Sequence, residues 1–425
     1  MMTAAENEVL TRIGPDSRMG ALLRRYWQPV ATASDIENKW THKLRVLGEN
    51  LVLFKDRSGK TGLIGETCPH RNASLAYGIP AEDGLRCPYH GWKFNAEGHC
   101  TEQPNETRHA LLGQKVIASY PVQELGGLIF AYMGPLPAPM LPRLDGLVAK
   151  GVMRQIGRVV IPCNWLQIME NSVDPVHVEW AHGAMTEFMH EDEGLKTPWT
   201  RRHAKIGFDE FEQGIIKRRM LEGQTEDHVD WKIGHPLIFP NALAVGVVGG
   251  QWTEYRFQFR IPVDDTNTLH FWYTAQVPPQ GATVPGHLLT RTPVYDVPVK
   301  DEHGEYLLKH IHAQDIMNWV TQGAIADRTN ESLGASDRGI VFYRRMLMRE
   351  LEKVERGEDP IRTNRDPLKD DVINLPMEPS GNMFSRGFEA SFRAHMLAFS
   401  PMCEEIIEVF KSAERNKARE PVPAK

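Results

Sequence analysis

The sequence predicts an α+β protein in which a small all-β unit precedes a larger unit of helices and strands. Short β-rich runs broken by turn residues fill residues 42–135, and the proline-rich stretch at 134–144 is typical of a semi-rigid connector. Beyond it, helical and strand patterns follow one another without the regular strand–helix–strand order of a parallel sheet. The 425 residues are enough for two or three domains with cores of their own.

Hydrophobic periodicity predicts the individual elements. A short amphipathic helix is expected at 17–27, and longer helical patterns occur at 164–185, 313–326, 338–356 and 402–417. Strand patterns occur at 210–222, 242–249, 252–263 and 269–277. The predicted divisions are an N-terminal helical segment that packs on the larger unit (1–41), the β unit (42–136) and the larger unit itself (137–425).

Composition and charge exclude several classes of protein. The 49 Lys and Arg against 55 Asp and Glu give a net charge of −6, so nothing in the balance attracts nucleic acid or an anionic membrane. The sequence has no run near the roughly 18 apolar residues of a membrane-spanning helix, no secretory signal at its start and no glycine-rich phosphate loop. Five cysteines in such a long chain do not make a disulfide framework, so a cytoplasmic protein is expected.

Two pairs of metal-ligating residues lie within the β unit. Cys68 and His70 form C-x-H, and Cys87 and His90 form C-x2-H on a second Gly/Pro-rich loop. Two thiolates on one iron and two imidazoles on the other make the Rieske [2Fe–2S] arrangement. A structural zinc site is the alternative, but zinc loops usually separate the first two ligands by two to four residues and here one residue separates them.

A second pair of histidines lies in the predicted helix 164–185. His177 and His182 are five residues apart, which places them about 140° apart around an α-helix. They can share a metal ion only if the helix loosens or ends, and Asp174-Pro175 is a natural break because Pro disfavours helical geometry in the residue before it. Taken alone, such a pair is as consistent with ordinary core or surface histidines.

A carboxylate would complete this pair as the two-His, one-carboxylate triad of non-heme iron oxygenases, which leaves coordination positions open. The candidates are Asp315 and Asp327. Asp327 lies near the predicted helix end beside Arg328, where an ion pair or a cap is expected. Asp315 lies deeper in the apolar pattern, where an unpaired charge would be costly, so we choose Asp315.

These strings resemble those of a known family. C-P-H-R at 68–71, C-P-Y-H-G-W at 87–92 and E-N-S-V-D-P-V-H at 170–177 are similar to motifs of the large (α) subunit of Rieske non-heme iron oxygenases, and the resemblance covers nearly the full length. The stretches at 13–30 and 314–337 resemble the phthalate 4,5-dioxygenase branch, which includes O-demethylases of lignin-derived aromatics. The resemblance implies a Rieske domain followed by a catalytic domain whose antiparallel sheet is flanked by helices, of the helix-grip type.

The resemblance also implies roles for individual residues. It assigns one set of residues to the [2Fe–2S] cluster and a second set to ferrous iron. Asn171 belongs to the motif at 170–177, but the resemblance gives it no defined role. Asp174 matches the carboxylate that connects a cluster histidine of one subunit with an iron-ligating histidine of the next, which implies a homotrimer; a helix cap before Pro175 is the alternative. The cluster residues are Cys68, His70, Cys87 and His90, and the iron residues are His177, His182 and Asp315.

The expected function is that of a terminal oxygenase that uses O2 and takes electrons from NADH through a reductase, with or without a ferredoxin. Its expected reaction is O-demethylation of a carboxylated methoxy-aromatic, such as the biaryl 5,5′-dehydrodivanillate, with release of formaldehyde. The alternatives are cis-dihydroxylation of an aromatic carboxylate such as a phthalate or chlorobenzoate, and electron transfer without oxygenase activity. Arg218 and Arg219 are candidates for binding the substrate carboxylate, since strand alternation turns one of them toward a cavity. The alternative, equally consistent with the sequence, is that these arginines lie on a solvated face or form an ion pair at an interface.

Overall fold

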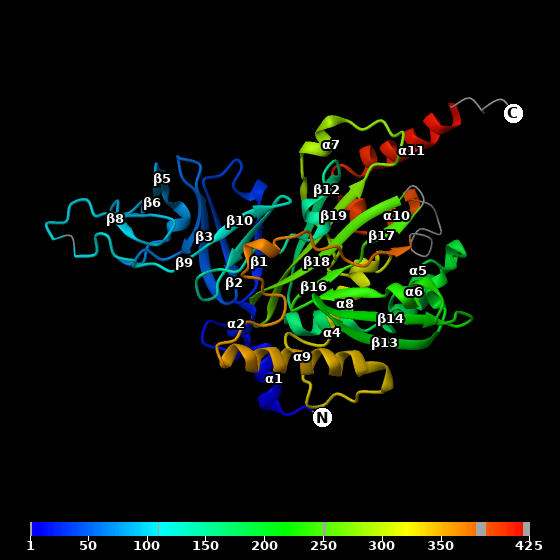
Figure 1. Ribbon diagram of the computed structural model, residues 1–425. Helices are drawn as coiled ribbons and strands as arrows, with labels where there is room; N and C mark the ends of the chain where they lie inside the picture. Colours follow the sequence, from blue (N-terminus) through cyan, green and yellow to red (C-terminus); the bar gives the residue numbers. More distant parts are fainter. Residues whose placement is uncertain (1, 109, 250–251, 380–387, 420–425) are drawn as a thin grey trace.

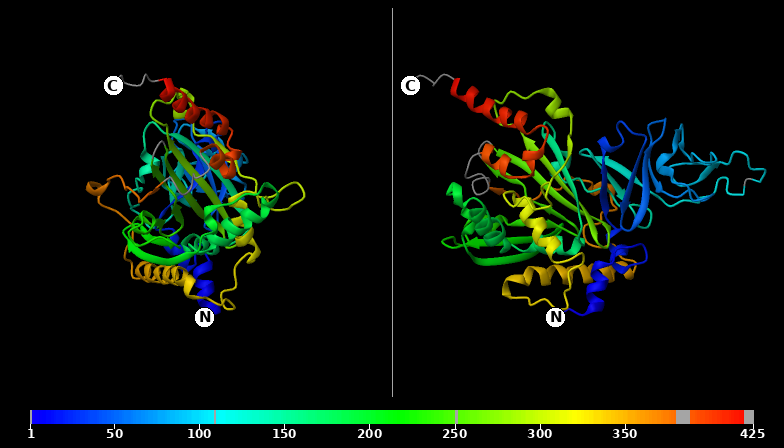
Figure 2. Two further views of the ribbon diagram at one scale, coloured as in Figure 1. Left: turned by 90° about the vertical axis from the view of Figure 1, so that its right-hand side faces the viewer. Right: turned by 180° about the vertical axis from the view of Figure 1, so that it is seen from behind.

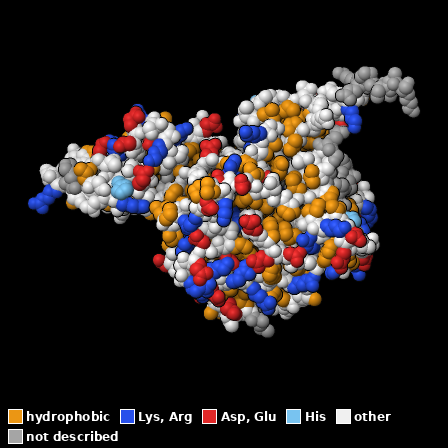
Figure 3. Space-filling view, viewed as in Figure 1, with side chains coloured by type: hydrophobic (Ala, Val, Ile, Leu, Met, Phe, Trp, Pro, Cys, Tyr) orange, Lys and Arg blue, Asp and Glu red, His pale blue; other side chains and the backbone are white. Residues whose placement is uncertain are grey.

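The computed structural model describes residues 2–108, 110–249, 252–379 and 388–419, and it has the predicted α+β architecture (Figure 1). The β unit forms a lobe that projects from a larger body, and the view from behind shows the same separation (Figure 2). The space-filling view shows this lobe as an arm beside the broad surface of the body (Figure 3).

The β unit consists of three small antiparallel sheets, ordered β1-β11-β10, β2-β3-β4-β9 and β5-β6-β7-β8. In β3, Leu51 and Leu53 enter one hydrophobic core while Val52 and Phe54 enter another, which explains why this strand is apolar without a break. The strands are β1 (Trp27–Thr32), β2 (Thr41–Val46), β3 (Glu49–Lys55), β4 (Thr61–Gly65), β5 (Ile79–Ala81), β6 (Gly84–Arg86), β7 (Lys93–Phe94), β8 (Cys100–Glu102), β9 (Ser119–Tyr120), β10 (Val122–Leu125) and β11 (Leu128–Tyr132).

The N-terminal segment is not wholly helical, which corrects the prediction for residues 1–41. The helix expected at 17–27 ends at Leu23, and Trp27 begins β1, which pairs antiparallel with β11. The physical reason is Pro29, which cannot donate within a helix and favours extended backbone in the residue before it. By its pairing β1 belongs to the β unit, while the three domain boundaries stay a prediction.

The larger unit is built on a ten-stranded sheet, ordered β13-β14-β15-β16-β18-β19-β12-β20, with β17 paired to β18 and β21 paired to β17. Its pairings are antiparallel except for those of the short strands β20 and β21, so the sheet is mixed at its margins. The predicted strands at 252–263 and 269–277 are confirmed, whereas the region 210–222 includes the turn between β13 and β14, and the region 242–249 is divided into β16 and β17. The strands are β12 (Met153–Ile161), β13 (His203–Phe211), β14 (Gly214–Leu221), β15 (His235–Ile238), β16 (Ala242–Ala244), β17 (Val247–Gly249), β18 (Trp252–Asp264), β19 (Asn267–Val277), β20 (Val294–Asp296) and β21 (Glu378–Pro379).

Helices cover this sheet and tie it to the N-terminus. The predicted helix at 313–326 ends early, at Thr321, and the one at 164–185 is interrupted after Val173. Among the described residues, no helix is long and apolar enough to cross a membrane. The helices are α1 (Ala4–Thr11), α2 (Arg18–Leu23), α3 (Asp145–Val148), α4 (Trp165–Val173), α5 (Met185–Met189), α6 (Val229–Ile233), α7 (Gly286–Thr290), α8 (Ile311–Thr321), α9 (Arg338–Glu355), α10 (Phe388–Ala394) and α11 (Cys403–Arg419).

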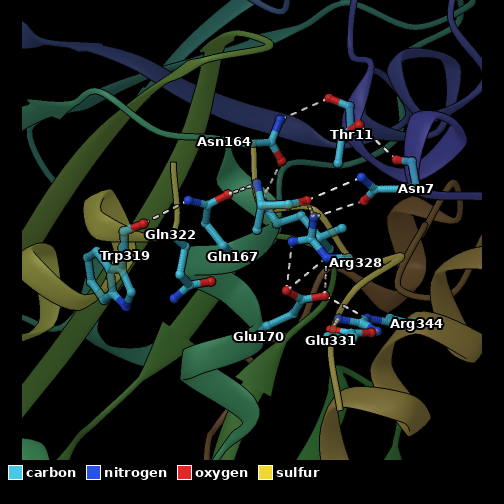
Figure 4. Close-up of polar contacts among 12 residues, drawn as sticks. Asn7, Thr11, Asn164, Gln167, Glu170, Trp319, Gln322, Arg328, Glu331 and Arg344 are labelled. Carbon is cyan, nitrogen blue, oxygen red and sulfur yellow. Dashed lines mark hydrogen bonds and ion pairs between the residues drawn. The ribbon is translucent and has the colours of Figure 1, made fainter. Parts of the chain in front are cut away.

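A buried ion-pair network fixes α4 in the larger unit (Figure 4). The Glu170 carboxylate accepts hydrogen bonds from Arg328 Nη2 at 2.7 Å and from Arg344 Nε at 2.6 Å. Arg344 also pairs with Glu331, and Arg328 donates to Asn7 of α1. Removing one partner of a buried ion pair costs about 3–5 kcal/mol, so this network holds α1, α4, α9 and the segment after α8 in one arrangement.

One turn earlier, Gln167 ties α4 directly to the end of α8 (Figure 4). Its amide nitrogen donates to the carbonyl oxygens of Trp319 at 2.8 Å and Gly323 at 2.9 Å, and its amide oxygen accepts from Ala326 N at 3.0 Å. One side chain therefore joins the helix that precedes His177 to the helix that carries Asp315 by one hydrogen bond and to the segment directly after that helix by two.

Candidate metal centres

The two loops of the β unit that carry the predicted cluster residues share one construction. The amide of Asn72 donates to the carbonyl of Cys68 at 2.9 Å, and the amide of Gly91 donates to the carbonyl of Cys87 at 3.1 Å. Asn72 and Gly91 have φ angles of 57° and 78°, the left-handed region that Gly and Asn tolerate best. Each loop is thus a tight turn whose cysteine lies at its base and whose histidine lies at its tip.

The loops bring four potential ligands together at the end of the lobe. Cys68 and Cys87 are buried, while His70 and His90 are half-buried with their ring centroids 4.6 Å apart. The Trp92 ring stacks on His70 at 4.6 Å. This division, thiols inside and imidazoles outside, fits a binuclear cluster with one iron bound by sulfur and the other by nitrogen.

The electrostatics of the thiols also fit a metal cluster. Burial, together with the neighbouring Cys87, raises the pKa of the Cys68 thiol to about 11, although the amides of His70 and Arg71 act in the opposite direction. The Cys68 thiol in such a position ionises only if positive charge is supplied to it. A cluster would supply that charge.

The second centre depends on a break in helical geometry between α4 and α5. Helix α4 ends at Val173, Asp174 has extended backbone, and the residues Val178–Ala184 form a π-helix that begins directly after His177. A π-helix links residues five apart by its hydrogen bonds, so residues at i and i+5 lie on nearly the same face. The rings of His177 and His182 consequently approach each other, with centroids 5.3 Å apart. The expected break at Asp174-Pro175 is confirmed.

Asp315 of α8 meets these two rings. Its Oδ1 atom lies 3.3 Å from His182 Nε2 and 3.8 Å from His177 Nε2, and one ligand atom from each residue fits within a span of 4.8 Å. This oxygen is buried and has no hydrogen-bond partner among the residues that the structure describes. Burial alone would raise the pKa of Asp315, but the two imidazoles and Arg260 lower it. An orphaned carboxylate oxygen facing two imidazole nitrogens fits a divalent metal ion.

Asp327 is not part of this group. Its side chain is exposed, and its Oδ1 accepts hydrogen bonds from the Thr329 amide at 3.0 Å and the Thr329 hydroxyl at 2.6 Å. Oδ2 accepts from Asn330. Asp327 therefore organises the turn after α8, and its neighbour Arg328 pairs with Glu170 instead.

Asp174 and Asn171 lie beside the second centre. Asp174 Oδ1 accepts from the Val176 amide at 2.8 Å and Oδ2 accepts from the His177 amide at 3.1 Å. The same Oδ2 lies 3.5 Å from His177 Nδ1. Asp174 thus forms the turn after α4 and also faces the imidazole of His177, so its two predicted roles are compatible. Asn171 contributes to the wall of the adjoining cavity.

This cavity, of about 160 Å³, separates the three residues from the polar face of the sheet. Its walls come from the end of α4, the π-helix and α8, and its floor comes from β14, β16, β18 and β19. The floor is cationic, and Arg219 is the one of its cations that was predicted above as a candidate for binding substrate. The floor side chains are Lys217, Arg219, Leu243, Arg256, Gln258, Arg260 and Trp272.

The two predicted arginines differ in their partners. Arg218 is engaged by Asp209 at 2.5 Å and by the carbonyl of Trp231. Arg219 donates to both oxygens of the buried Glu378, at 3.3 and 3.1 Å. Burial would raise the pKa of Glu378, but the charges of Arg219 and His235 lower it to about 2. The charge of Arg219 is already balanced, and its role in binding substrate stays a prediction.

Lys217 and Arg260 are the cations that sequence reasoning missed. Lys217 Nζ donates to the carbonyl of Ser172 at 2.7 Å and Arg260 donates to the carbonyl and side chain of Gln258. Among the described residues, neither has a carboxylate within 4 Å. Burial, with the charge of Arg219, lowers the pKa of Lys217 to about 8, and burial lowers that of Arg260 to about 9. The sequence signal that could have identified Arg260 was the alternation E-x-R-x-Q-x-R in β18.

Comparisons with known proteins agree with both centres. The Rieske [2Fe-2S] domain family matches residues 26–121, and the family described as LigXa C-terminal domain like matches residues 299–374. The 5,5′-dehydrodivanillate O-demethylase oxygenase subunit of Sphingobium sp. is 43% identical over 381 residues, which are 88% of this chain and 87% of that protein. The chain belongs to the Rieske non-heme iron oxygenases.

Other relatives place it within the family. The phthalate 4,5-dioxygenase oxygenase subunit of Pseudomonas putida is 29% identical over 434 residues, 92% of this chain and 96% of that protein. The solved structure of the Pseudomonas putida CBB5 NdmA QL mutant with caffeine has a TM-score of 0.61 at 19% identity, covers 82% of this chain and 100% of its own, and supports the fold. As an oxygenase subunit of this family, the protein is an oxidoreductase with a Rieske cluster and Fe(II), supplied with electrons from NADH through a reductase.

Replacing Asp315 tests the second centre. We expect Asp315→Asn to lose the mononuclear iron, because the neutral amide removes the one carboxylate charge that faces both imidazoles. Asp327→Asn, on the turn after the same helix, should keep it. Iron and acid-labile sulfide analysis, with the visible spectrum of the cluster as an internal standard, measures both. Retention of the extra iron by Asp315→Asn would remove this residue from the site.

Proposed function

We propose that this protein is the terminal oxygenase that O-demethylates a carboxylated methoxy-aromatic, such as the lignin-derived biaryl 5,5′-dehydrodivanillate. In the overall reaction an aryl methyl ether, O2, NADH and a proton become a phenol, formaldehyde, water and NAD⁺. The observation that carries the proposal is a cationic cavity directly beside His177, His182 and Asp315, in a chain that is 43% identical to an O-demethylase subunit.

In this proposal Cys68, His70, Cys87 and His90 hold the cluster, and His177, His182 and Asp315 hold the iron. The cluster supplies single electrons and the iron supplies activated dioxygen when both are bound. The sequence alternative of a pure electron carrier needs only the β unit, whereas here the second set of ligands is assembled beside a cavity. That assembly supports an oxygenase.

The cavity residues orient the substrate. Lys217 on β14 and Arg260 on β18 present buried positive charge that no carboxylate of the described part of the chain pairs with, and β15 and β16 separate them. Leu243, in the floor between them, offers apolar surface. An acidic aromatic can balance these charges while its ring covers the apolar strip, and the indole rings of Trp272 in the floor and Trp319 in the wall exclude water from the cavity. The three iron residues then face the same ring from the other side.

Product analysis tests the reaction. With 5,5′-dehydrodivanillate and a compatible reductase, we expect formaldehyde and NAD⁺ in equal amounts, because one methyl group leaves for each pair of electrons used. Phthalate and 3-chlorobenzoate serve as the comparison, since relatives 29% and 31% identical are named as dioxygenases of these acids. Formation of a cis-dihydrodiol without formaldehyde would favour dihydroxylation instead.

Lys217→Met tests substrate binding. Loss of one charge-assisted hydrogen bond of about 1.5–3 kcal/mol should weaken binding of the acidic substrate roughly 10- to 100-fold. Binding of a methyl ester of the same compound should change much less. Lys205→Met, which removes an exposed lysine of β13 paired with Glu226, is the control. Ligand titration measures each affinity; equal losses for the acid and the ester would contradict the proposal.

We further infer that the protein is a homotrimer in which the cluster of one chain serves the iron of the next. The end of the lobe exposes Tyr77 and Tyr89 beside the cluster loops, and a groove on the outer side of the iron site contains Asp174, Trp180 and Phe188. Trp180 and Phe188 are each 70% exposed. Two different apolar patches on one chain favour head-to-tail association, which closes into a ring.

Trp180→Glu tests this association. A charge in the groove should dissociate the assembly and slow electron transfer between the centres at least 10-fold, while the iron content of each centre stays the same. Leu368→Glu, on an exposed site outside the groove, is the control. Light scattering gives the mass and single-turnover kinetics gives the transfer rate. An unchanged mass and rate for Trp180→Glu would exclude this face as the interface.

A further inference from the structure

His182 contacts the side chain of Gln314, which is neither part of the histidine motif nor one of the proposed iron ligands. Its Nδ1 lies 3.0 Å from Oε1 of Gln314, the residue directly before Asp315. Its Nε2 faces Asp315 Oδ1 on the other side of the ring. Gln314 is fully buried, so this contact lies out of reach of solvent.

The partners of Gln314 determine which of its amide atoms faces the histidine. Its Nε2 donates to the carbonyl oxygen of Leu308 at 2.8 Å and to the hydroxyl of Thr186 at 3.0 Å. A backbone carbonyl can only accept, so the NH2 group must be on that side and the amide oxygen must face His182. An amide oxygen also only accepts, and therefore Nδ1 of His182 carries a hydrogen and Nε2 presents its lone pair.

His177 is held differently. Its Nδ1 lies 3.5 Å from the Asp174 carboxylate, beyond a good hydrogen bond, and both Asp174 oxygens already accept backbone amides. His177 therefore adjoins a charged group that also faces the outer groove, whereas His182 is bound to a neutral amide inside the protein. Of the two imidazoles, His182 is the one whose Nδ1 lies within hydrogen-bond distance of a buried side chain.

We propose that Gln314 is a positioning residue that locks His182 in the Nδ1–H tautomer and aims Nε2 at the iron. The inference rests on the proposed iron site. It makes α8 the source of two adjacent contributions, the carboxylate of Asp315 and the amide that orients the neighbouring ligand. Partners of this kind in other metal sites are worth 10- to 100-fold in metal affinity.

The test compares two substitutions of Gln314 in the full-length protein. Gln314→Met keeps the approximate shape and removes the acceptor, so Fe(II) affinity should fall 10- to 100-fold. Gln314→Glu keeps an acceptor for Nδ1–H but cannot donate to Leu308, and its affinity should stay within about 3-fold of wild type. Gln322→Met, which removes an exposed amide bonded to Asn318 at the end of the same helix, should change nothing.

Anaerobic chelator competition measures Fe(II) affinity, and the cluster spectrum and melting temperature report folding. Equal losses in Gln314→Met and Gln314→Glu would assign Gln314 to structure and overturn the proposal, as would wild-type affinity in Gln314→Met. If both variants fold poorly, Thr186→Val decides, because it removes one amide partner without touching His182: a loss below about 3-fold supports the proposal, and a larger loss overturns it. Iron retention by Asp315→Asn would instead refute the proposed site itself.

Discussion

Two histidines five residues apart can face one ion only if the backbone between them is not an α-helix. The chain meets this condition by ending α4 at Val173 and entering a π-helix after His177. Pro175 ends the first helix, and the Asp174 carboxylate accepts the amides left free at the start of the next. The approach of the two rings, the meeting with Asp315 and the position of Asp174 all follow from this one irregularity.

The irregularity needs firm support, because an isolated helix break has little reason to adopt one geometry. Glu170, buried with Arg328 and Arg344, fixes the helix before the break, and Gln167 connects it to α8 (Figure 4). Gln314 fixes the segment after the break through His182 and Thr186. Rigid attachment on both sides of the break leaves one arrangement for the three ligands, which is what a preorganised metal site requires.

The cluster loops could be predicted from sequence because their ligands lie within short turns. Spacing singled out Cys68 and His90, and the Asp174-Pro175 signal located the break. Asp315 was chosen by an argument about burial, since a charge deep in an apolar helix needs a partner, and the structure places it beside both imidazoles. The strand β1 was missed because Tyr26 and Trp27 continue a helical pattern that only Pro29 interrupts.

The cations of the cavity could not be identified from the sequence because their burial depends on contacts between distant segments of the chain. Residues 254–260 alternate polar and aromatic side chains, which normally indicates a strand with one face in water. Here Glu254, Arg256 and Arg260 are as buried as Phe257, because helices cover the polar face as well. Whether such a face meets solvent or a buried site depends on elements far away in the chain, so Lys217 and Arg260 could not be singled out by local pattern.

The distribution of buried charge distinguishes the iron site from the surrounding network. Glu170 is paired with arginines, Glu378 with Arg219 and Glu254 with Arg256. Among the described residues, Asp315 has no Lys or Arg within 4 Å and faces only imidazoles, which are neutral when they act as metal ligands. Glu170, Glu378 and Glu254 are thus each paired with an arginine, whereas the charge of Asp315 would be balanced by a bound metal ion.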